Sequence, residues 1–289
     1  MDTVPLVSIV VPCYRGERYL AEAIESCLRQ SHRNFEVVVV DDASPDRCAE
    51  IATRYVAADD RVRLIRHPRN KGVSHAFNTG FAAARGAYFA RLAQDDVFRA
   101  DAITIMLDRI RSEPEVGLVY CDMQLIDADG RFMHMLPTEE VGRALLPAHR
   151  VGVCVLWSRA AWETVGPFDP RYDTADDYEF FLRVSRRFRL AKCAGEAPFY
   201  FRYHPAQGGV QLSKQQDYAY VLAQLAHYKS LVRTHMFRPA YWRKIVTCWI
   251  RARARKRVWM RSAEYREYLR KRALNSGADP GAEARLAFR

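Results

Sequence analysis

The sequence predicts an α/β fold: a mostly parallel sheet with helices on both faces, followed by a helical, basic C-terminal extension. Short, mostly apolar runs occur four times in the first hundred residues, the first two rich in β-branched residues, without the polar alternation of a half-exposed strand. Segments with helical spacing separate these runs, as the crossovers of a parallel sheet require. The last quarter of the chain keeps helical spacing and is rich in Lys and Arg.

The first half of the chain alternates between predicted strands and predicted helices. The strands are expected at 7–12, 35–40, 62–65 and 87–92. The helices are expected at 15–31, around Ile51 to Val56, at 73–84 and at 102–110. Pro12 ends the first apolar run, and Gly86 follows the third helix, as helix-ending glycines often do.

The second half departs from this regular alternation. Further strands are expected at 116–121 and 151–158, and a helix at 178–188. After the first of these strands, Asp127-Ala-Asp-Gly130 predicts the turn of an antiparallel hairpin between two short extended segments. Helical spacing resumes from Leu212 to about Leu274, and the remainder is rich in Gly and Ala. We therefore expect an α/β domain over 1–210, a helical basic extension over 211–274 and a frayed tail over 275–289.

Acidic residues follow two of the predicted strands directly. Asp41-Asp42 ends the second strand and Asp95-Asp96 follows the fourth, while Pro12-Cys-Tyr14 ends the first. The carboxyl ends of parallel strands share one edge of a sheet, where ligands of open α/β sheets bind. Two adjacent carboxylates there suit Mg²⁺ or Mn²⁺, whose remaining ligands are phosphate oxygens and water. For Asp95-Asp96 the alternative is a solvated turn or a helix N-cap, and for Asp41-Asp42 it is that Ser44 or Asp42 caps the next helix.

Two other motifs allow a functional and a structural interpretation. Asp176-Asp177 opens a predicted helix, so its charges either interact with the helix dipole or supply a general base. His204 follows another extended run and is either a buried structural histidine or a ligand. The residues themselves leave these alternatives open.

Composition excludes several classes of protein. No apolar run is long enough to span a bilayer, and residues 1–6 lack the pattern of a secretory signal, so we expect a cytoplasmic location. The seven cysteines are scattered singly without a zinc motif, and nothing marks one as a nucleophile. Residues 238–272 contain thirteen Lys and Arg against two Glu, which accounts for the +11 charge of the whole chain.

Three segments of the chain resemble family 2 glycosyltransferases of the GT-A fold. The first comprises Val7-Ser-Ile-Val-Val-Pro12-Cys-Tyr14 and Val-Val-Val-Asp41-Asp42-Ala-Ser44. The second runs from Asn70-Lys71-Gly72 to Asp95-Asp96, and the third joins Val165-Gly-Pro-Phe-Asp169 to Asp176-Asp177-Tyr-Glu. The resemblance covers about two thirds of the chain, from Val7 to His204. It departs from the family pattern at Ala93-Gln94, where the family often has an acid.

The resemblance implies a Rossmann-like GT-A fold and an inverting transfer of a sugar from a nucleotide diphosphate donor, with a UDP-sugar favoured. The acceptor is expected to be a hydroxyl of a glycan or a lipid-linked molecule, in the polysaccharide biosynthesis of a cell envelope. By this resemblance the nucleotide sugar is bound by Pro12, Tyr14, Asp42 and Asp95. Asp96 and His204 bind a divalent cation, Mg²⁺ or Mn²⁺, and Asp177 is the general base.

Two other functions remain as alternatives. A nucleotidyltransferase would need a Gly-rich phosphate loop after the first strand, where this chain has Cys13-Tyr14-Arg15-Gly16 with a single glycine. A sugar-nucleotide binder without activity would bind donor and be indifferent to the loss of Asp177.

The basic segment 238–272 also has two interpretations. Its Trp, Ile and Val stripe beside a run of arginines is typical of a helix lying on an anionic membrane, which would make the protein peripheral on the inner face. Alternatively, the stripe packs on the catalytic domain and the arginines are merely solvated. Nucleic-acid binding is disfavoured, because the rim of the sheet is acidic and no nucleic-acid motif is present.

Overall fold

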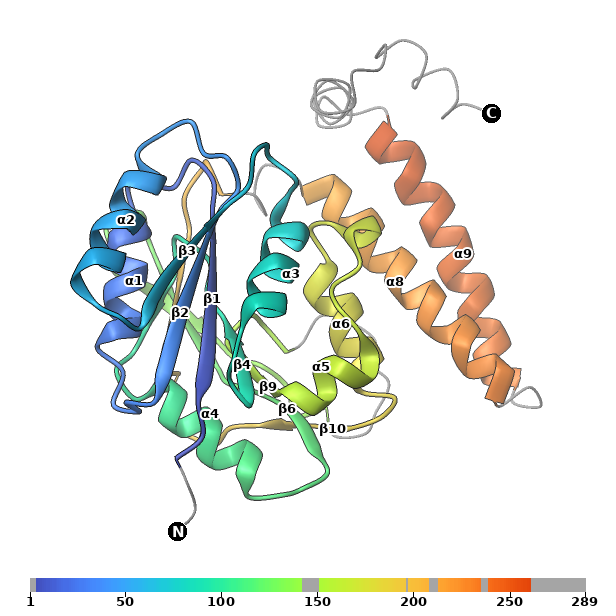
Figure 1. Ribbon diagram of the computed structural model, residues 1–289. Coiled ribbons are helices and arrows are strands. Elements are labelled where there is room, and N and C mark those ends of the chain that lie inside the picture. The colour runs from blue at the N-terminus through green and yellow to red at the C-terminus, as the bar shows by residue number, and fades with distance from the viewer. Residues whose placement is uncertain (1–3, 142–150, 196, 208–212, 235–238, 261–289) are drawn as a thin grey trace. The chain divides into compact units, whose positions relative to one another are not determined.

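A computed structural model describes residues 4–141, 151–195, 197–207, 213–234 and 239–260 (Figure 1). The chain divides into two compact units, residues 1–170 with 180–204 and residues 171–179 with 205–289. The predicted domain boundary after residue 210 stays a prediction, and the predicted frayed tail, 275–289, lies outside the described residues.

The first unit is built on a seven-stranded sheet of order β10-β6-β9-β4-β1-β2-β3 (Figure 1). Its strands are β1 (Val7–Cys13), β2 (Phe35–Asp41), β3 (Val62–Arg66), β4 (Tyr88–Arg91), β6 (Val116–Tyr120), β9 (Val155–Ser158) and β10 (Arg189–Lys192). All neighbours pair in parallel except β9, which is antiparallel to β4 and to β6. The predicted mostly parallel α/β sheet is therefore confirmed.

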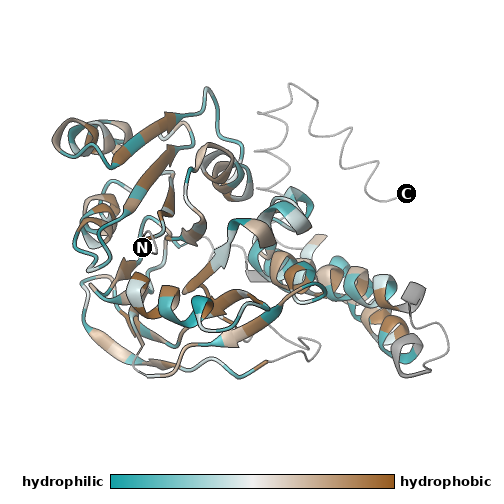
Figure 2. Cartoon of the chain, turned by 60° about the horizontal axis from the view of Figure 1, so that its bottom comes forward, coloured by the Kyte–Doolittle hydropathy of each residue, from teal (hydrophilic) through white to brown (hydrophobic). Residues whose placement is uncertain are grey.

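Helices cover both faces of this sheet. They are α1 (Leu20–Leu28), α2 (Cys48–Ala58), α3 (Val73–Ala83), α4 (Ala102–Arg111) and α5 (Arg159–Val165). Ile9 and Val11 of β1 belong to a buried cluster with residues of α1, α2 and α4, whereas Gly80 of α3 lies against Val10 on the opposite face. Figure 2 shows mostly hydrophobic strands and helices that carry both hydrophobic and hydrophilic residues. The strands lack polar alternation because both of their faces are buried.

A second, four-stranded sheet has the order β5-β11-β7-β8. Its strands are β5 (Val97–Phe98), β7 (Met123–Ile126), β8 (Phe132–Leu136) and β11 (Phe199–Arg202). The predicted hairpin is confirmed, because β7 and β8 pair in antiparallel fashion and Asp127 N donates to Arg131 O at 2.9 Å. Gly130 has a φ of +83°, the left-handed conformation that favours glycine in such a turn.

The first predicted helix begins later than its spacing suggested. The sequence predicted a helix over 15–31, but α1 starts at Leu20. Arg15 has a φ of +54°, and residues 14–16 form the loop that leaves β1. The seven cysteines are all free and buried, as expected of packing residues.

The second unit contains the helices α8 (Ser213–Thr234) and α9 (Pro239–Met260). It also contains most of the short helix η1 (Pro170–Tyr172) and the start of α6 (Asp176–Val184). The predicted helical stretch is confirmed over α8 and α9, and its last part, 261–274, lies outside the described residues. Cys248 Sγ lies 3.9 Å from Gln224 Oε1, and Arg255 pairs with Asp217 at 2.8 Å, so α9 packs along α8.

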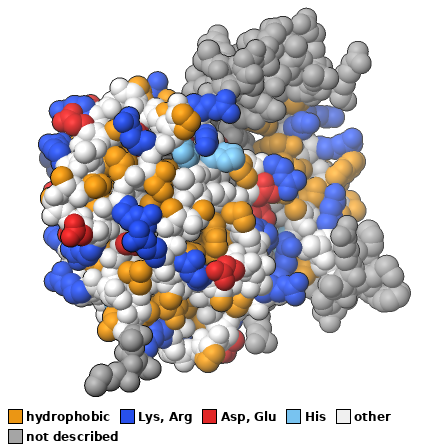
Figure 3. Space-filling model, in the orientation of Figure 1, with side chains coloured by type: hydrophobic (Ala, Val, Ile, Leu, Met, Phe, Trp, Pro, Cys, Tyr) orange, Lys and Arg blue, Asp and Glu red, His pale blue; other side chains and the backbone are white. Residues whose placement is uncertain are grey.

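Figure 3 shows basic and hydrophobic side chains interleaved over the described part of these helices. Among the residues that the structure describes, every helix is too short or too polar to cross a bilayer.

Candidate active site

Three loops that follow strands are joined to one another at one edge of the large sheet. Strand β1 lies between β2 and β4, and both pair with it in parallel. The Gln94 side chain accepts from Tyr14 N at 2.8 Å and donates to Tyr14 O at 3.0 Å, so it ties the loop after β4 to the loop after β1. Arg15 N donates to Ser44 Oγ at 2.7 Å and ties that loop to the one after β2. The acidic strand ends are therefore gathered as predicted.

Asp42 is buried at this edge, and its carboxylate organises the loop before α3. It accepts hydrogen bonds from Lys71 N at 2.9 and 3.0 Å and from Gly72 N at 2.8 Å. Its Oδ1 also lies 2.6 Å from His67 Nδ1, and His67 Nε2 lies 2.8 Å from Thr79 Oγ1. The Asp42 carboxylate is thus held by His67, Lys71 and Gly72, and a role in nucleotide binding stays a prediction.

Helix capping does not account for Asp42. Asp46 Oδ1 accepts from Cys48 N at 3.1 Å, at the start of α2, and from Ser44 Oγ at 2.5 Å. Asp41 Oδ1 accepts from Ser44 N at 2.9 Å and closes the turn after β2. The side-chain contacts of the turn before α2 therefore come from Asp41 and Asp46, whereas Asp42 bonds the loop before α3.

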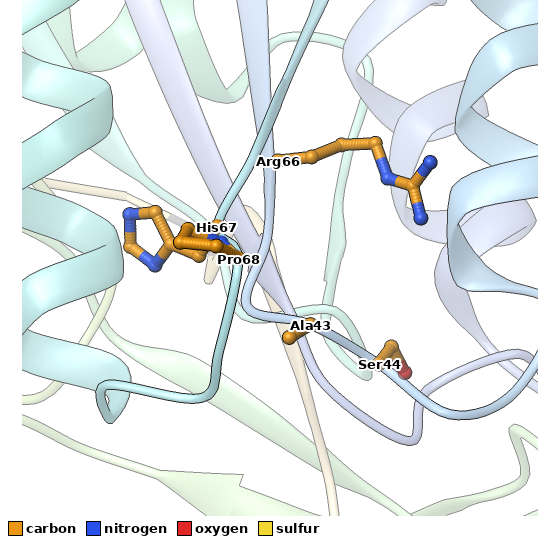
Figure 4. Close-up of a pocket in the computed structure, with 5 residues that line it drawn as sticks. All are labelled: Ala43, Ser44, Arg66, His67 and Pro68. Carbon is orange, nitrogen blue, oxygen red and sulfur yellow. The ribbon is translucent and has the colours of Figure 1, made fainter.

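A shallow pocket of about 460 Å³ opens beside these residues, lined by Ala43, Ser44, Arg66, His67 and Pro68 (Figure 4). The His67 ring and the Arg66 guanidinium point to opposite sides of the chain. Of the residues predicted to bind nucleotide, Tyr14 is 37% exposed at the end of β1, whereas Pro12 is buried within the strand. Tyr14 is therefore accessible to a ligand, whereas Pro12 is not, and a role of either in nucleotide binding stays a prediction.

Asp95 and Asp96 are both nearly inaccessible to solvent. Asp96 Oδ1 accepts from Arg202 N at 2.9 Å, and Asp95 Oδ2 lies 2.9 Å from His204 Nε2. Burial, and then the negative charge of Asp95, raises the pKa of the Asp96 carboxyl well above its usual range. A carboxylate pair with this mutual repulsion gains from a cation placed beside it.

The chemistry of these donors fits a hard divalent cation. Carboxylate oxygens suit Mg²⁺ and Mn²⁺, which retain phosphate and water ligands besides a few protein groups. Within the described ranges no three His, Cys, Asp or Glu side chains are grouped to hold a metal ion by themselves. His204 contacts the acidic pair through Asp95, and its role in cation binding stays a prediction.

Asp177 belongs to the second unit, where it lies in the first turn of α6. Its Oδ1 accepts from Tyr178 N at 2.7 Å, and its side chain is mostly buried. The neighbouring Tyr178 Oη accepts from Gln224 Nε2 at 3.2 Å, which attaches this turn to α8. A catalytic role for Asp177 stays a prediction.

Sequence reasoning missed three side chains that build this edge: His67, Gln94 and Arg202. Nothing in the local pattern distinguishes His67 or Gln94 from ordinary loop residues. Arg202 carried a weak signal, since it ends the extended run that His204 follows.

Comparison with known proteins gives a consistent result. The sequence profile of glycosyl transferase family 2 matches residues 8–157. Chondroitin synthase of Escherichia coli is 31% identical over 64% of this chain and 27% of its own length. EpsJ of Bacillus subtilis (strain 168), an uncharacterized glycosyltransferase, is 32% identical over 70% of this chain and 62% of its own length. The chain thus spans less than two thirds of either relative.

Solved structures share the fold at low sequence identity. S. aureus TarS 1-349 in complex with UDP-GlcNAc has a TM-score of 0.65 at 16% identity, covering 85% of this chain and 72% of that one. The mannosyltransferase PcManGT from Pyrobaculum calidifontis, in complex with GDP-Man and Mn²⁺, has a TM-score of 0.58 at 17% identity, covering 99% and 81%. These likenesses establish the GT-A architecture.

Proposed function

We propose that this chain, which belongs to glycosyl transferase family 2, is a glycosyltransferase that transfers a sugar with inversion from a UDP-sugar to a hydroxyl. The predicted family resemblance and the GT-A fold are confirmed. The acceptor we propose is a glycan or a lipid-linked molecule used in polysaccharide biosynthesis of the cell envelope.

The observation that carries this proposal is the joining of the loops after β1, β2 and β4 at one sheet edge. Gln94 and Ser44 link these loops by hydrogen bonds, so Asp42 and the Asp95–Asp96 pair stand on one connected frame. In our proposal Asp42 contacts the nucleoside and the Asp95–Asp96 pair lies at its diphosphate. Structures related in fold carry UDP-GlcNAc, or GDP-Man with Mn²⁺, and so support a nucleotide sugar as the donor.

In the proposed mechanism the chain positions the donor and moves one proton. Tyr14 and Asp42 hold the base and ribose, Asp95 contacts the ribose or sugar, and Asp96, with His204 beside the pair, holds a divalent cation. That cation, when bound, offsets the negative charge of the departing diphosphate. Asp177 takes the proton of the acceptor hydroxyl while the hydroxyl oxygen forms a bond to the anomeric carbon. The bond to the diphosphate breaks on the opposite face, so the configuration inverts.

A donor screen tests this proposal. Purified protein with Mn²⁺ or Mg²⁺ is offered nucleotide sugars one at a time, and release of the nucleoside diphosphate is measured. We expect one donor to react and Asp96→Ala to abolish the reaction. Asp108→Ala, which changes an exposed carboxylate on α4, is the matched control and should react like the wild type.

The alternatives predict different results in the same screen. A non-catalytic binder would bind UDP tightly, release no diphosphate from any donor, and be unaffected by Asp177→Asn. A nucleotidyltransferase would instead form nucleotide sugar from nucleoside triphosphate and sugar phosphate. Either result would replace the transferase proposal.

We also propose that the basic segment 238–272 attaches the protein to an anionic membrane surface. In the described part of this segment, Val246, Trp249 and Ile250 are 54%, 45% and 56% exposed. They recur at helical spacing, and the Arg253 guanidinium lies 4.1 Å from the centre of the Trp249 ring. Each Lys or Arg near an anionic surface adds about 1 kcal/mol to binding. A lipid-linked acceptor would then lie close to the enzyme, on the cytoplasmic face.

Vesicle sedimentation tests this attachment with the full chain. We expect vesicles containing anionic lipid to recover the wild type but much less of the double variant Trp249→Ser and Ile250→Ser. The double variant Arg33→Gln and Arg54→Gln, which removes exposed charges of the first unit, should sediment like the wild type. Equal recovery of all three proteins would refute membrane attachment through α9.

A further inference from the structure

Arg202 is almost completely buried, and its contacts converge on the acidic pair. Its side chain is only 2% exposed, which is rare for an arginine unless its charge is paired. Its Nε donates to Asp95 O at 2.8 Å, and its backbone N donates to Asp96 Oδ1 at 2.9 Å. A single residue therefore braces both Asp95 and Asp96, one through its side chain and the other through its main chain.

The far end of the guanidinium is anchored to α1. Nη2 donates to Glu22 Oε2 at 2.6 Å, and the guanidinium carbon lies 4.8 Å from the centre of the Tyr19 ring. The same ring lies 5.0 Å from the His204 ring, which itself contacts Asp95. Arg202 thus connects α1, the loop after β4 and the end of β11 in one buried network.

Only a planar fork can make these contacts together. The Nε and Nη2 donors of arginine point in fixed directions and reach Asp95 O and Glu22 at the same time. The single ammonium group of lysine cannot occupy both donor positions. A positive charge alone is therefore insufficient to make both contacts. The geometry of the guanidinium holds the loop after β4.

We propose that Arg202 is a positioning residue that holds the Asp95–Asp96 turn in the orientation in which the pair receives the divalent cation of a nucleotide diphosphate. This inference rests on the proposed function. Arg202 itself contacts neither the cation nor the sugar. Its effect is transmitted through the main chain of Asp95, the side chain of Asp96 and the ring of Tyr19 beside His204.

Calorimetric titration of Mn²⁺ into protein saturated with UDP tests this role. Groups that orient metal ligands commonly change metal affinity by about 10- to 100-fold when replaced. We expect Arg202→Lys to raise the Kd for Mn²⁺ about tenfold or more, while UDP binding without metal changes far less. Glu22→Gln, a change at a half-exposed side chain, should shift the Kd in the same direction by a smaller factor.

Arg63→Lys is the matched control. Arg63 also bridges a carboxylate and a carbonyl, Glu36 Oε2 at 2.7 Å and Ala83 O at 3.1 Å, but away from the site edge. Its replacement should lower the melting temperature and leave the Kd for Mn²⁺ at the wild-type value. The melting temperature of each variant without metal shows how much of any change in the Kd for Mn²⁺ comes from loss of folded protein. Where Arg202→Lys does not fold, the Glu22→Gln titration decides.

Two results would overturn the inference without touching the proposed function. One is wild-type Mn²⁺ affinity in Arg202→Lys or, where that variant does not fold, in Glu22→Gln. The other is an equal loss of metal-free UDP binding, which would make Arg202 a general structural residue. If the wild type with UDP bound no Mn²⁺ at all, the proposed cation and this inference would fail together.

Discussion

Replacing Asp42 with Asn tests whether this carboxylate organises the site edge. The carboxylate accepts from two backbone N–H groups, of Lys71 and Gly72, and pairs with His67. Asparagine keeps one oxygen acceptor and turns an amide donor toward groups that also donate. Asp42 is only 3% exposed, so water cannot replace the lost acceptor.

The expected cost follows from these contacts. A hydrogen bond to a charged group contributes about 1.5–3 kcal/mol, and a buried donor left unsatisfied costs about 1–3 kcal/mol. We therefore expect Asp42→Asn to lower the free energy of unfolding by about 3 kcal/mol. UDP affinity should fall as well, because the Lys71–Gly72 loop that leads into α3 loses its anchor.

Urea unfolding at neutral pH measures the free energy, and an unchanged slope shows that the unfolding reaction is the same. Asp60→Asn, at an exposed position that makes the same chemical change, should stay within about 0.5 kcal/mol of the wild type. If Asp42→Asn were as stable as Asp60→Asn, the anchoring role assigned to Asp42 would be wrong.

Two further predictions concern the sheet. Burial alone would raise the pKa of Glu36, but hydrogen bonds from Arg85 N, Ser8 and Arg63 outweigh it and lower the pKa. This carboxylate therefore stabilises the fold above its unfolded pKa of about 4.3, and the contribution is lost as pH falls through the folded value. Urea unfolding at several pH values should show a weaker acid dependence in Glu36→Gln. For Gly80→Ala, the new Cβ would lie 2.2 Å from Val10 Cγ1, so we expect a loss of about 1–3 kcal/mol in thermal unfolding; a wild-type melting temperature would contradict the close packing of α3.

Much of the fold could be predicted from the sequence alone. The parallel sheet followed from strands such as 35–40, whose continuous apolar character reports burial on both faces. The Asp127–Gly130 turn was readable because a left-handed glycine marks a hairpin locally. In contrast, β5 has two residues and no pattern of its own, and its pairing with β11 depends on a segment a hundred residues away.

Only part of the candidate site could be predicted from the sequence, because the rest also depends on contacts between distant segments. Asp42 and Asp96 stand at strand ends, and strand direction alone brings such positions to one edge of a sheet. The residues that surround them have no local sequence signal, because His67, Gln94 and Arg202 form hydrogen bonds to residues 25, 80 and 107 positions away. Local order is encoded by neighbouring residues, whereas a hydrogen bond across the sheet edge exists only after packing has brought its two ends within 3 Å.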